Sequence, residues 1–104
     1  MKLQIIPSDE AEFQIAELGA WWRRNRTSAP NLFRDNLRKT FATLAESPLI
    51  GTPYECEGVP GLRRILVRKT PYHVYYVPAL EGGKLYVVAV WSGMLAEGPP
   101  LRRP

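Results

Sequence analysis

The sequence predicts an α+β fold with the element order β-α-α-β-β-β, in which an N-terminal helical hairpin packs on one face of an antiparallel sheet. Three observations support this prediction. A short, branched apolar segment opens the chain at residues 2–6, two stretches with helical apolar spacing follow it, and residues 61–91 hold three strand-like segments. The 104 residues suit a single domain over 1–104, and a hydrophobic content of 45% predicts a packed core.

Residues 2–6 (KLQII) predict the first strand, which Pro7 ends because proline cannot continue the pairing. Ser8 then caps a helix that we expect to run to about Asn25. Two adjoining apolar stripes follow this helix at helical spacing. One stripe holds Phe13, Ala16 and Ala20, and the other holds Ile15, Leu18 and Trp22.

A second helix is predicted from a cap at Thr27 or Ser28 to about Ser47. The short link between the two helices predicts an antiparallel hairpin. Residues 48–60 contain several glycines and prolines and predict a loop. The apolar stripe of the second helix consists of Phe33, Leu37, Phe41 and Leu44.

Three further strands are predicted at Leu62–Arg68, Tyr72–Val77 and Lys84–Trp91. The connections between them are so short that neighbouring strands must pair antiparallel. The last residues, about 92–104, show no periodicity and predict a loosely ordered tail.

Strand alternation divides the residues of the first of these strands between two faces. If Ile65 and Val67 point into the core, Arg64 and Arg68 point to the face that the helices leave uncovered. A surface that is both cationic and aromatic suits phosphates and bases, although charged and aromatic residues also occur on ordinary half-exposed sheets. The predicted members of this face are Arg64, Arg68, His73 and Tyr75.

The end of the first helix offers a second candidate surface, where Trp21 and Trp22 precede several arginines. Adjacent residues lie about 100° apart around a helix, so both indoles cannot sit centrally in one core. Either one ring packs inward and the other covers the hairpin turn, or a tryptophan anchors a protein partner, since Trp and Arg are common at binding hot spots. The residues predicted to bind a partner are Arg63, Arg64, Arg68, Trp22, Arg23 and Arg24.

The net charge of +4 and a pI near 9.5 favour an acidic partner, either a nucleic acid or an acidic protein segment. The single cysteine, Cys56, excludes an intrachain disulfide and a cysteine-built zinc site, and it fits a reducing cytoplasm. The start of the chain does not read as a secretion signal, and no apolar run approaches the roughly 18 residues that span a bilayer. We therefore expect a cytoplasmic protein with no membrane partner.

The sequence contains no glycine-rich phosphate loop and no metal-ligand spacing, so we expect neither a metal nor a cofactor. His73 lies among arginines, which should lower its pKa and favour a neutral ring that could act as a base. Acid–base cleavage of a phosphate also needs a second proton-handling group, and none pairs with His73 on these strands. The residues alone therefore make a weak case for an enzyme.

The element order, the run from Phe33 to Pro53 (FRDNLRKTFATLAESPLIGTP), the segment GLRRILVRKTPYHVYYV and the closing VVAVW together resemble the RelE/ParE superfamily. These are small bacterial toxins of type II toxin–antitoxin modules, often labelled plasmid stabilisation proteins. The resemblance covers nearly the whole chain up to Trp91. It implies a growth-inhibiting toxin that a cognate, usually acidic antitoxin holds inactive, which fits the basic charge.

The superfamily has two established activities, and the resemblance bears on both. Its RelE-like branch cleaves mRNA in the ribosome with cations from the sheet and a late tyrosine or histidine, whereas its ParE-like branch inhibits DNA gyrase. Arg64 matches a lysine position of the nuclease branch, but Leu66 and His73 fall where further cations are expected, and the segment after Trp91 lacks a late tyrosine. These departures favour a ParE-like toxin that acts by binding a protein target such as DNA gyrase.

Two alternatives remain at the level of the sequence. A metal-independent, ribosome-dependent endoribonuclease of the RelE type would use the face described above, with Arg64, Arg68, His73 and Tyr75 as catalytic candidates. A toxin-derived domain that has lost toxicity would bind only its antitoxin.

Overall fold

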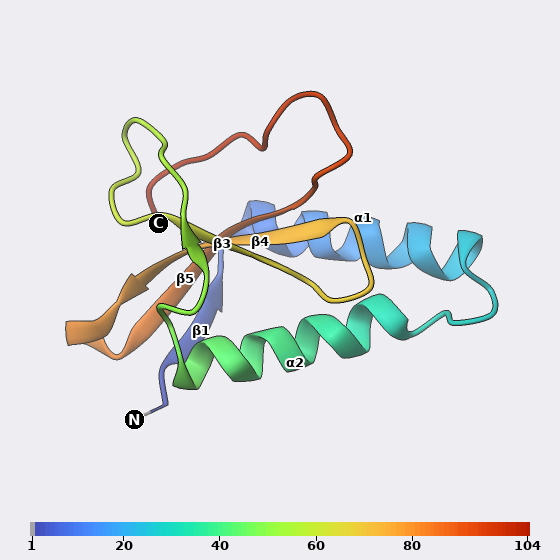
Figure 1. Ribbon diagram of the computed structural model, residues 1–104, viewed down its shortest axis with the longest axis horizontal. Helices are drawn as coiled ribbons and strands as arrows, with labels where there is room; N and C mark the ends of the chain where they lie inside the picture. The colour runs from blue at the N-terminus through green and yellow to red at the C-terminus, as the bar shows by residue number, and fades with distance from the viewer. Residues whose placement is uncertain (1) are drawn as a thin grey trace.

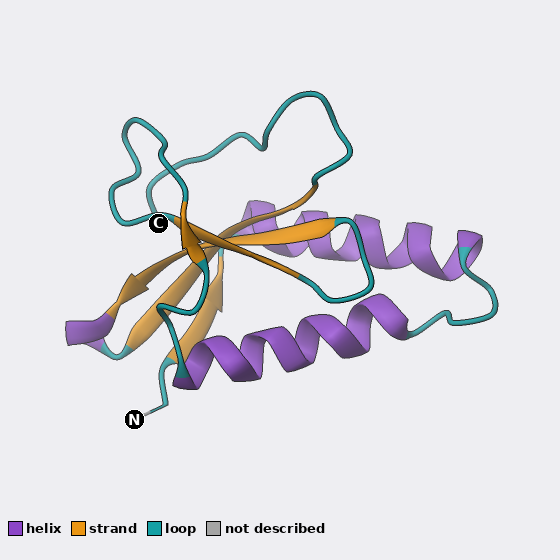
Figure 2. Ribbon diagram, viewed as in Figure 1, coloured by secondary structure: helices purple, strands orange, loops and turns teal. Residues whose placement is uncertain are grey.

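Two helices pack on one face of a five-stranded mixed sheet in the computed structural model, which describes residues 2–104 (Figure 1, Figure 2). The α+β class and the placement of the helical hairpin on one face are as the sequence predicted. The elements are β1 (Gln4–Pro7), α1 (Asp9–Asn25), α2 (Leu32–Glu46), β2 (Thr52–Pro53), β3 (Arg63–Leu66), β4 (Tyr72–Ala79), the 3-10 turn η1 (Leu80–Gly82) and β5 (Lys84–Ser92).

The sheet has the strand order β1-β5-β4-β3-β2 and corrects the prediction in two respects. First, the sheet is not antiparallel throughout, because β1 pairs parallel with β5, with Gln4 opposite Lys84. The connection from β1 to β5 contains both helices, and a connection of this length permits parallel pairing where a tight hairpin does not. Second, two residues of the predicted loop, Thr52 and Pro53, form an edge strand opposite Arg64 and Arg63.

The first helix begins and ends as predicted, with the Ser8 hydroxyl accepting a hydrogen bond from the Ala11 N–H at 3.1 Å. Of its two apolar stripes, the one that contains Ile15 and Trp22 faces the core. The other stripe faces outward, so that Phe13 is 66% exposed. This helix therefore presents an apolar residue on the side that does not touch the sheet.

The second helix begins later than predicted. The chain forms turns from residue 27 to residue 31, and the helix starts at Leu32 after a cap at Asn31. The physical reason lies in Pro30, which disfavours helical backbone at the preceding Ala29. Once started, the helix buries Phe33 and Leu37 of the predicted stripe in the core.

The main core lies between the helices and the sheet, and a second apolar cluster lies on the opposite face. The second cluster is formed by Val59, Leu62, Tyr75, Val88 and Ala89. Residues of the loop after β2 and Leu101 of the C-terminal segment pack against it. The face that was expected to be uncovered is therefore covered in part.

The segment after Ser92, for which we expected loose order, has no regular secondary structure and returns to this second face (Figure 1). The Trp91 indole N–H donates a hydrogen bond to the Glu97 carbonyl at 2.9 Å, and the Arg103 Nε donates one to the Gly58 carbonyl at 3.0 Å. Arg102 also forms an exposed ion pair with Glu10 at 3.3 Å.

A buried contact holds β2 against the sheet. The Gly51 N–H donates a hydrogen bond to the Tyr76 hydroxyl at 3.0 Å. A Cβ atom at Gly51 would lie 2.5 Å from that hydroxyl oxygen and 2.7 Å from the Arg64 carbonyl oxygen, so only glycine fits there without a shift.

Neither helix in residues 2–104 is long and apolar enough to cross a bilayer.

Candidate functional site

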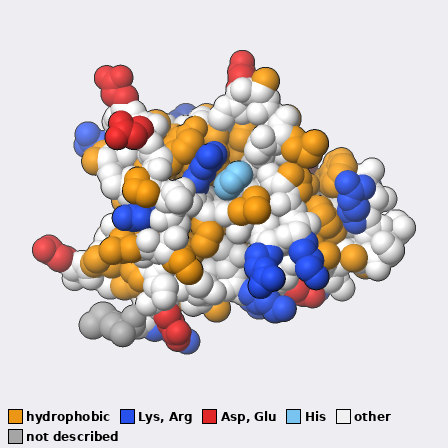
Figure 3. Space-filling view, viewed as in Figure 1, with side chains coloured by type: hydrophobic (Ala, Val, Ile, Leu, Met, Phe, Trp, Pro, Cys, Tyr) orange, Lys and Arg blue, Asp and Glu red, His pale blue; other side chains and the backbone are white. Residues whose placement is uncertain are grey.

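The second face of the sheet brings together Arg64, His73 and Tyr75, as strand alternation predicted. Antiparallel pairing places Arg64 opposite Tyr75 and Leu66 opposite His73. The Arg64 guanidinium lies 3.4 Å from the Tyr75 hydroxyl, and the rings of His73 and Tyr75 are 6.3 Å apart. Figure 3 shows the histidine on the surface beside a cationic side chain.

Tyr75 is not available as a stacking surface, because it is only 3% exposed. Its ring packs edge-on against the Tyr54 ring, with 5.1 Å between the ring centres. The Arg64 guanidinium lies 4.9 Å from the centre of the Tyr54 ring. Sequence reasoning missed Tyr54, which follows β2 in what was predicted to be a loop. The only signal was an aromatic residue directly after Pro53 in a stretch otherwise rich in small and polar residues.

Burial lowers the pKa of His73, and the nearby Arg64 cation lowers it further. The Nδ1 atom of His73 is buried and has no hydrogen-bond partner among residues 2–104. A protonated ring would place an unpaired N–H in this position, so the neutral ring is favoured. Gly93 lies against the same ring, since a Cβ atom there would be 3.1 Å from the His73 Cε1 atom.

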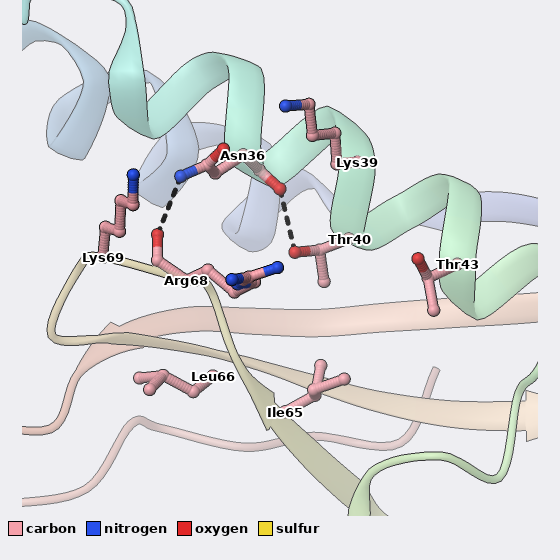
Figure 4. Close-up of a pocket in the computed structure, with 8 residues that line it drawn as sticks. All are labelled: Asn36, Lys39, Thr40, Thr43, Ile65, Leu66, Arg68 and Lys69. Carbon is pink, nitrogen blue, oxygen red and sulfur yellow. Dashed lines mark hydrogen bonds between the residues drawn. The ribbon is translucent and has the colours of Figure 1, made fainter.

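Arg68 does not join this group, which corrects its predicted place on the second face. Strand β3 ends at Leu66, and a turn closed by the Thr70 N–H and the Val67 carbonyl follows it. Within this turn Arg68 moves to the side of α2, where its carbonyl accepts a hydrogen bond from the Asn36 amide at 2.9 Å (Figure 4). Alternation predicted its position wrongly because the pleat stops before it.

Arg63 has a structural contact rather than a free guanidinium. Its Nη1 atom donates hydrogen bonds to the carbonyls of Gly51 at 2.7 Å and Leu49 at 3.2 Å. The side chain therefore holds the segment that leads into β2.

At the end of α1, Trp22 packs inward and Trp21 is the exposed ring. Trp22 is 6% exposed, and its indole N–H donates a hydrogen bond to the Ala29 carbonyl at 2.9 Å. The predicted binding role of Trp22 is therefore corrected: its ring is part of the core, while Trp21 is 39% exposed. The Arg26 guanidinium lies 5.3 Å from the centre of the Trp21 ring.

The remaining predicted residues of this surface, Arg23 and Arg24, are both exposed. They lie in the last turn of α1, where cations offset the helix dipole. They are thus available to a partner, together with Trp21.

The chemistry of the second face is that of one cation beside a neutral imidazole. In the described part of the chain, no carboxylate forms an ion pair with Arg64. The Arg64 cation is instead hydrogen-bonded to the Tyr75 hydroxyl at 3.4 Å.

Comparison with known proteins agrees with this fold. Residues 5–96 match the family model for the ParE toxin of the type II toxin–antitoxin system parDE. A comparison with curated protein sequences found no match.

Among solved structures, the chain is similar to a double arginine-to-alanine mutant of the E. coli toxin RelE in the free state, with a TM-score of 0.66 and 20% identity over 92% of this chain and 88% of that one. It is also similar to a chain of the chromosomal ParDE system from P. aeruginosa, with a TM-score of 0.63 and 11% identity over 88% of this chain and 96% of that one. At these identities the structures support the fold alone. Because the family match spans most of its length, this chain belongs to the ParE toxin family of type II toxin–antitoxin systems.

Proposed function

We propose that this protein is a ParE-like toxin that inhibits bacterial growth by binding DNA gyrase and that a cognate antitoxin neutralises it. The observation that carries this proposal is the composition of the second face. Arg64 is accompanied there by Leu66 and a neutral His73 rather than by further cations, and Tyr75 is buried. Such a face suits recognition of a protein better than cleavage of RNA.

The proposed partners follow from the charge and from the exposed groups. The net charge of +4 fits an acidic antitoxin. Arg23, Arg24, Arg64 and Arg68 are the predicted binding residues that retain accessible cations. Trp21 takes the place predicted for Trp22 as an aromatic anchor. We place this activity in the bacterial cytoplasm, and it needs no metal or cofactor.

A supercoiling assay with purified gyrase tests this proposal. We expect the purified protein to reduce the supercoiling of relaxed plasmid, and the Arg64→Ala and Trp21→Ala variants to reduce it less. A matched control premixes the toxin with the product of the reading frame that adjoins its gene, which should restore supercoiling. Unimpaired supercoiling at a large excess of toxin would remove gyrase as the target.

A second candidate function is supported by one specific observation. Arg64 and His73 line the same hollow, of about 270 Å³, at the edge of β3. We infer that, if this hollow holds an RNA phosphate, the protein is a ribosome-dependent endoribonuclease in which His73 handles the proton. His73→Ala would then abolish mRNA cleavage on translating ribosomes, and an absence of cleavage by the unmodified protein would remove this candidate.

The third possibility, a domain that has lost toxicity, makes a simple prediction. Expression of the chain alone in a bacterium would leave growth unchanged, although the antitoxin would still bind it. Growth arrest on expression contradicts this possibility and leaves the two active candidates to the assays above.

A further inference from the structure

A hollow of about 550 Å³ lies where the end of α1 meets the start of β4 and the segment that follows β5. We call it the α1–β4 hollow. Trp22 and Tyr72 line it from the main core, whereas Trp21, Met94 and Leu95 line it from the surface. A hollow of this volume accepts a small organic molecule, since ligand sites usually measure roughly 300–1,000 Å³.

The apolar part of this lining is open to solvent. Met94 is 82% exposed and Leu95 is 56% exposed, and Trp21 lines the same hollow. These are three of the eight large apolar side chains that residues 2–104 expose. A single exposed apolar residue is ordinary, but three around one concave site indicate a surface that a ligand covers.

Two cations, Arg26 and Lys69, line the same hollow, and none of its lining residues carries a carboxylate. Neither cation takes part in an ion pair within residues 2–104. The Arg26 guanidinium lies 5.3 Å and 5.7 Å from the ring centres of Trp21 and Trp22, which holds its charge beside the apolar lining. An anion bound here would therefore meet two cations and no competing carboxylate.

Lys69 lies in the turn between β3 and β4 with a φ of 65°, the only positive φ of a non-glycine residue in the described chain. This conformation favours glycine, so the turn carries its cation at a conformational cost. Backbone strain of this kind is concentrated at binding sites. The same geometry means that Lys69→Gly removes the charge without straining the turn.

The main chain of β4 offers no free edge at this hollow. The Tyr72 carbonyl accepts a hydrogen bond from the Val67 N–H at 2.8 Å. The Pro71 carbonyl accepts one from the Gly93 N–H at 2.7 Å. An extended peptide therefore cannot add here as a strand, and side chains must hold the ligand. A nucleic acid is also disfavoured, because its backbone requires a row of cations and this lining is mainly apolar.

We propose that the α1–β4 hollow binds a small amphipathic anion. The carboxylate or phosphate group of this ligand lies against Arg26 and Lys69. Its apolar body lies against Trp21, Met94 and Leu95. The hollow shares no lining residue with the one on the second face of the sheet, so the proposal does not depend on the target of the toxin. The ligand would join the end of α1, the β3–β4 turn and the segment after β5, and would stabilise the fold by mass action.

Two fluorescent probes of the same shape test the charged part of the site with the full chain. Anilinonaphthalene sulfonate is an amphipathic anion, and N-phenylnaphthylamine is the same ring system without the charge. We expect the anion to bind one-to-one and roughly three- to tenfold more tightly than the neutral probe. Lys69→Gly and Arg26→Gln should each weaken the anion by a similar factor and leave the neutral probe unchanged. Lys69→Arg should keep the affinity, as should Arg38→Gln, which removes an exposed cation of α2 outside the hollow.

The apolar part of the site is tested by a pair of double variants. Met94→Ser/Leu95→Ser should weaken both probes, because each probe loses the same apolar contacts. The matched control is Leu49→Ser/Ile50→Ser, which removes two apolar side chains that are each 55% exposed and lie outside the hollow. It should leave both affinities unchanged. Circular dichroism confirms that all variants fold.

Displacement of the bound probe identifies the class of ligand. Decanoate should displace the anionic probe, whereas decanol at the same concentration should not. The protein should also stay in solution when vesicles of phosphatidylglycerol and phosphatidylcholine are sedimented, since the ligand is a free molecule rather than a membrane surface. Equal affinity for the two probes overturns the assignment, as do equal losses in Arg26→Gln and Arg38→Gln or in the two serine variants. Sedimentation with the vesicles, without displacement by decanoate, overturns it as well.

Discussion

At the scale of single residues, His73 shows how local burial sets the chemistry of the second face. The ring lies between Leu66 of β3 and Trp91 of β5, close to the Gly93 backbone. Its buried Nδ1 atom has no hydrogen-bond partner in residues 2–104, and the Arg64 cation is near. Both conditions oppose protonation of the His73 ring in the folded protein.

This environment predicts a pH dependence of stability. The pKa of His73 in the folded state lies below its ordinary value of 6.5, so the unfolded chain binds more protons between the two values. The free energy of unfolding should therefore fall as the pH drops from neutral through 6.5 towards the folded-state pKa. Urea midpoints measured from about pH 7.5 to about pH 5.5 check this, because carboxylates titrate mainly below that window.

The control for this prediction is His73→Gln, which keeps a polar side chain but cannot gain the charge. In this variant, the free energy of unfolding should fall less steeply as the pH drops, because the contribution of His73 is gone. If both proteins lose the same stability over this window, the histidine is not the group responsible.

Strand alternation predicted the group on the second face correctly at three positions and wrongly at one. Arg64, His73 and Tyr75 share a face because they lie within regular strands. Arg68 departs because a turn begins before it, and the exact end of a strand depends on tertiary contacts such as the Asn36 amide. The burial of Tyr75 could not be predicted, since it depends on Tyr54 and on the second cluster, against which residues distant in sequence such as Leu101 also pack.

At the scale of elements, an aromatic cluster holds the helical hairpin to the sheet. Trp22 of α1 and Phe33 of α2 both pack edge-on against Tyr72 of β4. Their ring centres lie 6.0 Å and 5.2 Å, respectively, from that of Tyr72. The Trp22 indole N–H also donates a hydrogen bond to the Ala29 carbonyl in the turn between the helices. One side chain thus links the first helix, the turn and the sheet.

Replacement of this side chain should be costly. Trp22→Phe removes the hydrogen bond to the Ala29 carbonyl and part of the buried ring, which should lower the free energy of unfolding by about 1–3 kcal/mol. Trp21→Phe changes a half-exposed ring and should stay within about 0.5 kcal/mol of the unmodified protein. Urea unfolding of both variants measures the difference, and equal losses would contradict the assignment of Trp22 to the core.

The helices were predictable because each carries a long apolar periodicity, whereas the short elements were not. The two residues of β2 show no pattern of their own, and they pair because the Gly51–Tyr76 contact brings them to β3. In β5 the strict alternation is interrupted by a register shift opposite Tyr75 and Tyr76. That shift places the neighbouring residues Val88 and Ala89 in the second cluster, an outcome that a period of two does not predict.

At the scale of the whole molecule, the sheet has an apolar layer on each face. The helices cover one layer, while the loop after β2 and the C-terminal segment cover part of the other. A domain of about 100 residues has a small free energy of unfolding, so burial of this second layer contributes a significant part of that free energy.

The contribution of the C-terminal segment can be separated into apolar and ionic parts. Leu101→Ala removes an apolar contact with the second cluster and should lower the free energy of unfolding by about 1 kcal/mol. Arg102→Ala removes only an exposed ion pair with Glu10 and should cost about 0.3 kcal/mol or less. Thermal or urea unfolding distinguishes the two, and no loss in Leu101→Ala would show that the segment does not stabilise the sheet.

The position of β5 has a consequence for synthesis of the protein. This strand is synthesised after the other four, yet it lies inside the sheet between β1 and β4. Until it emerges, β1 has no neighbour and the apolar side of α1 has no surface to cover, because α1 packs mainly on β5. A chain cut short before Ser92 therefore cannot complete its sheet, and the fold forms only after β5 has been synthesised.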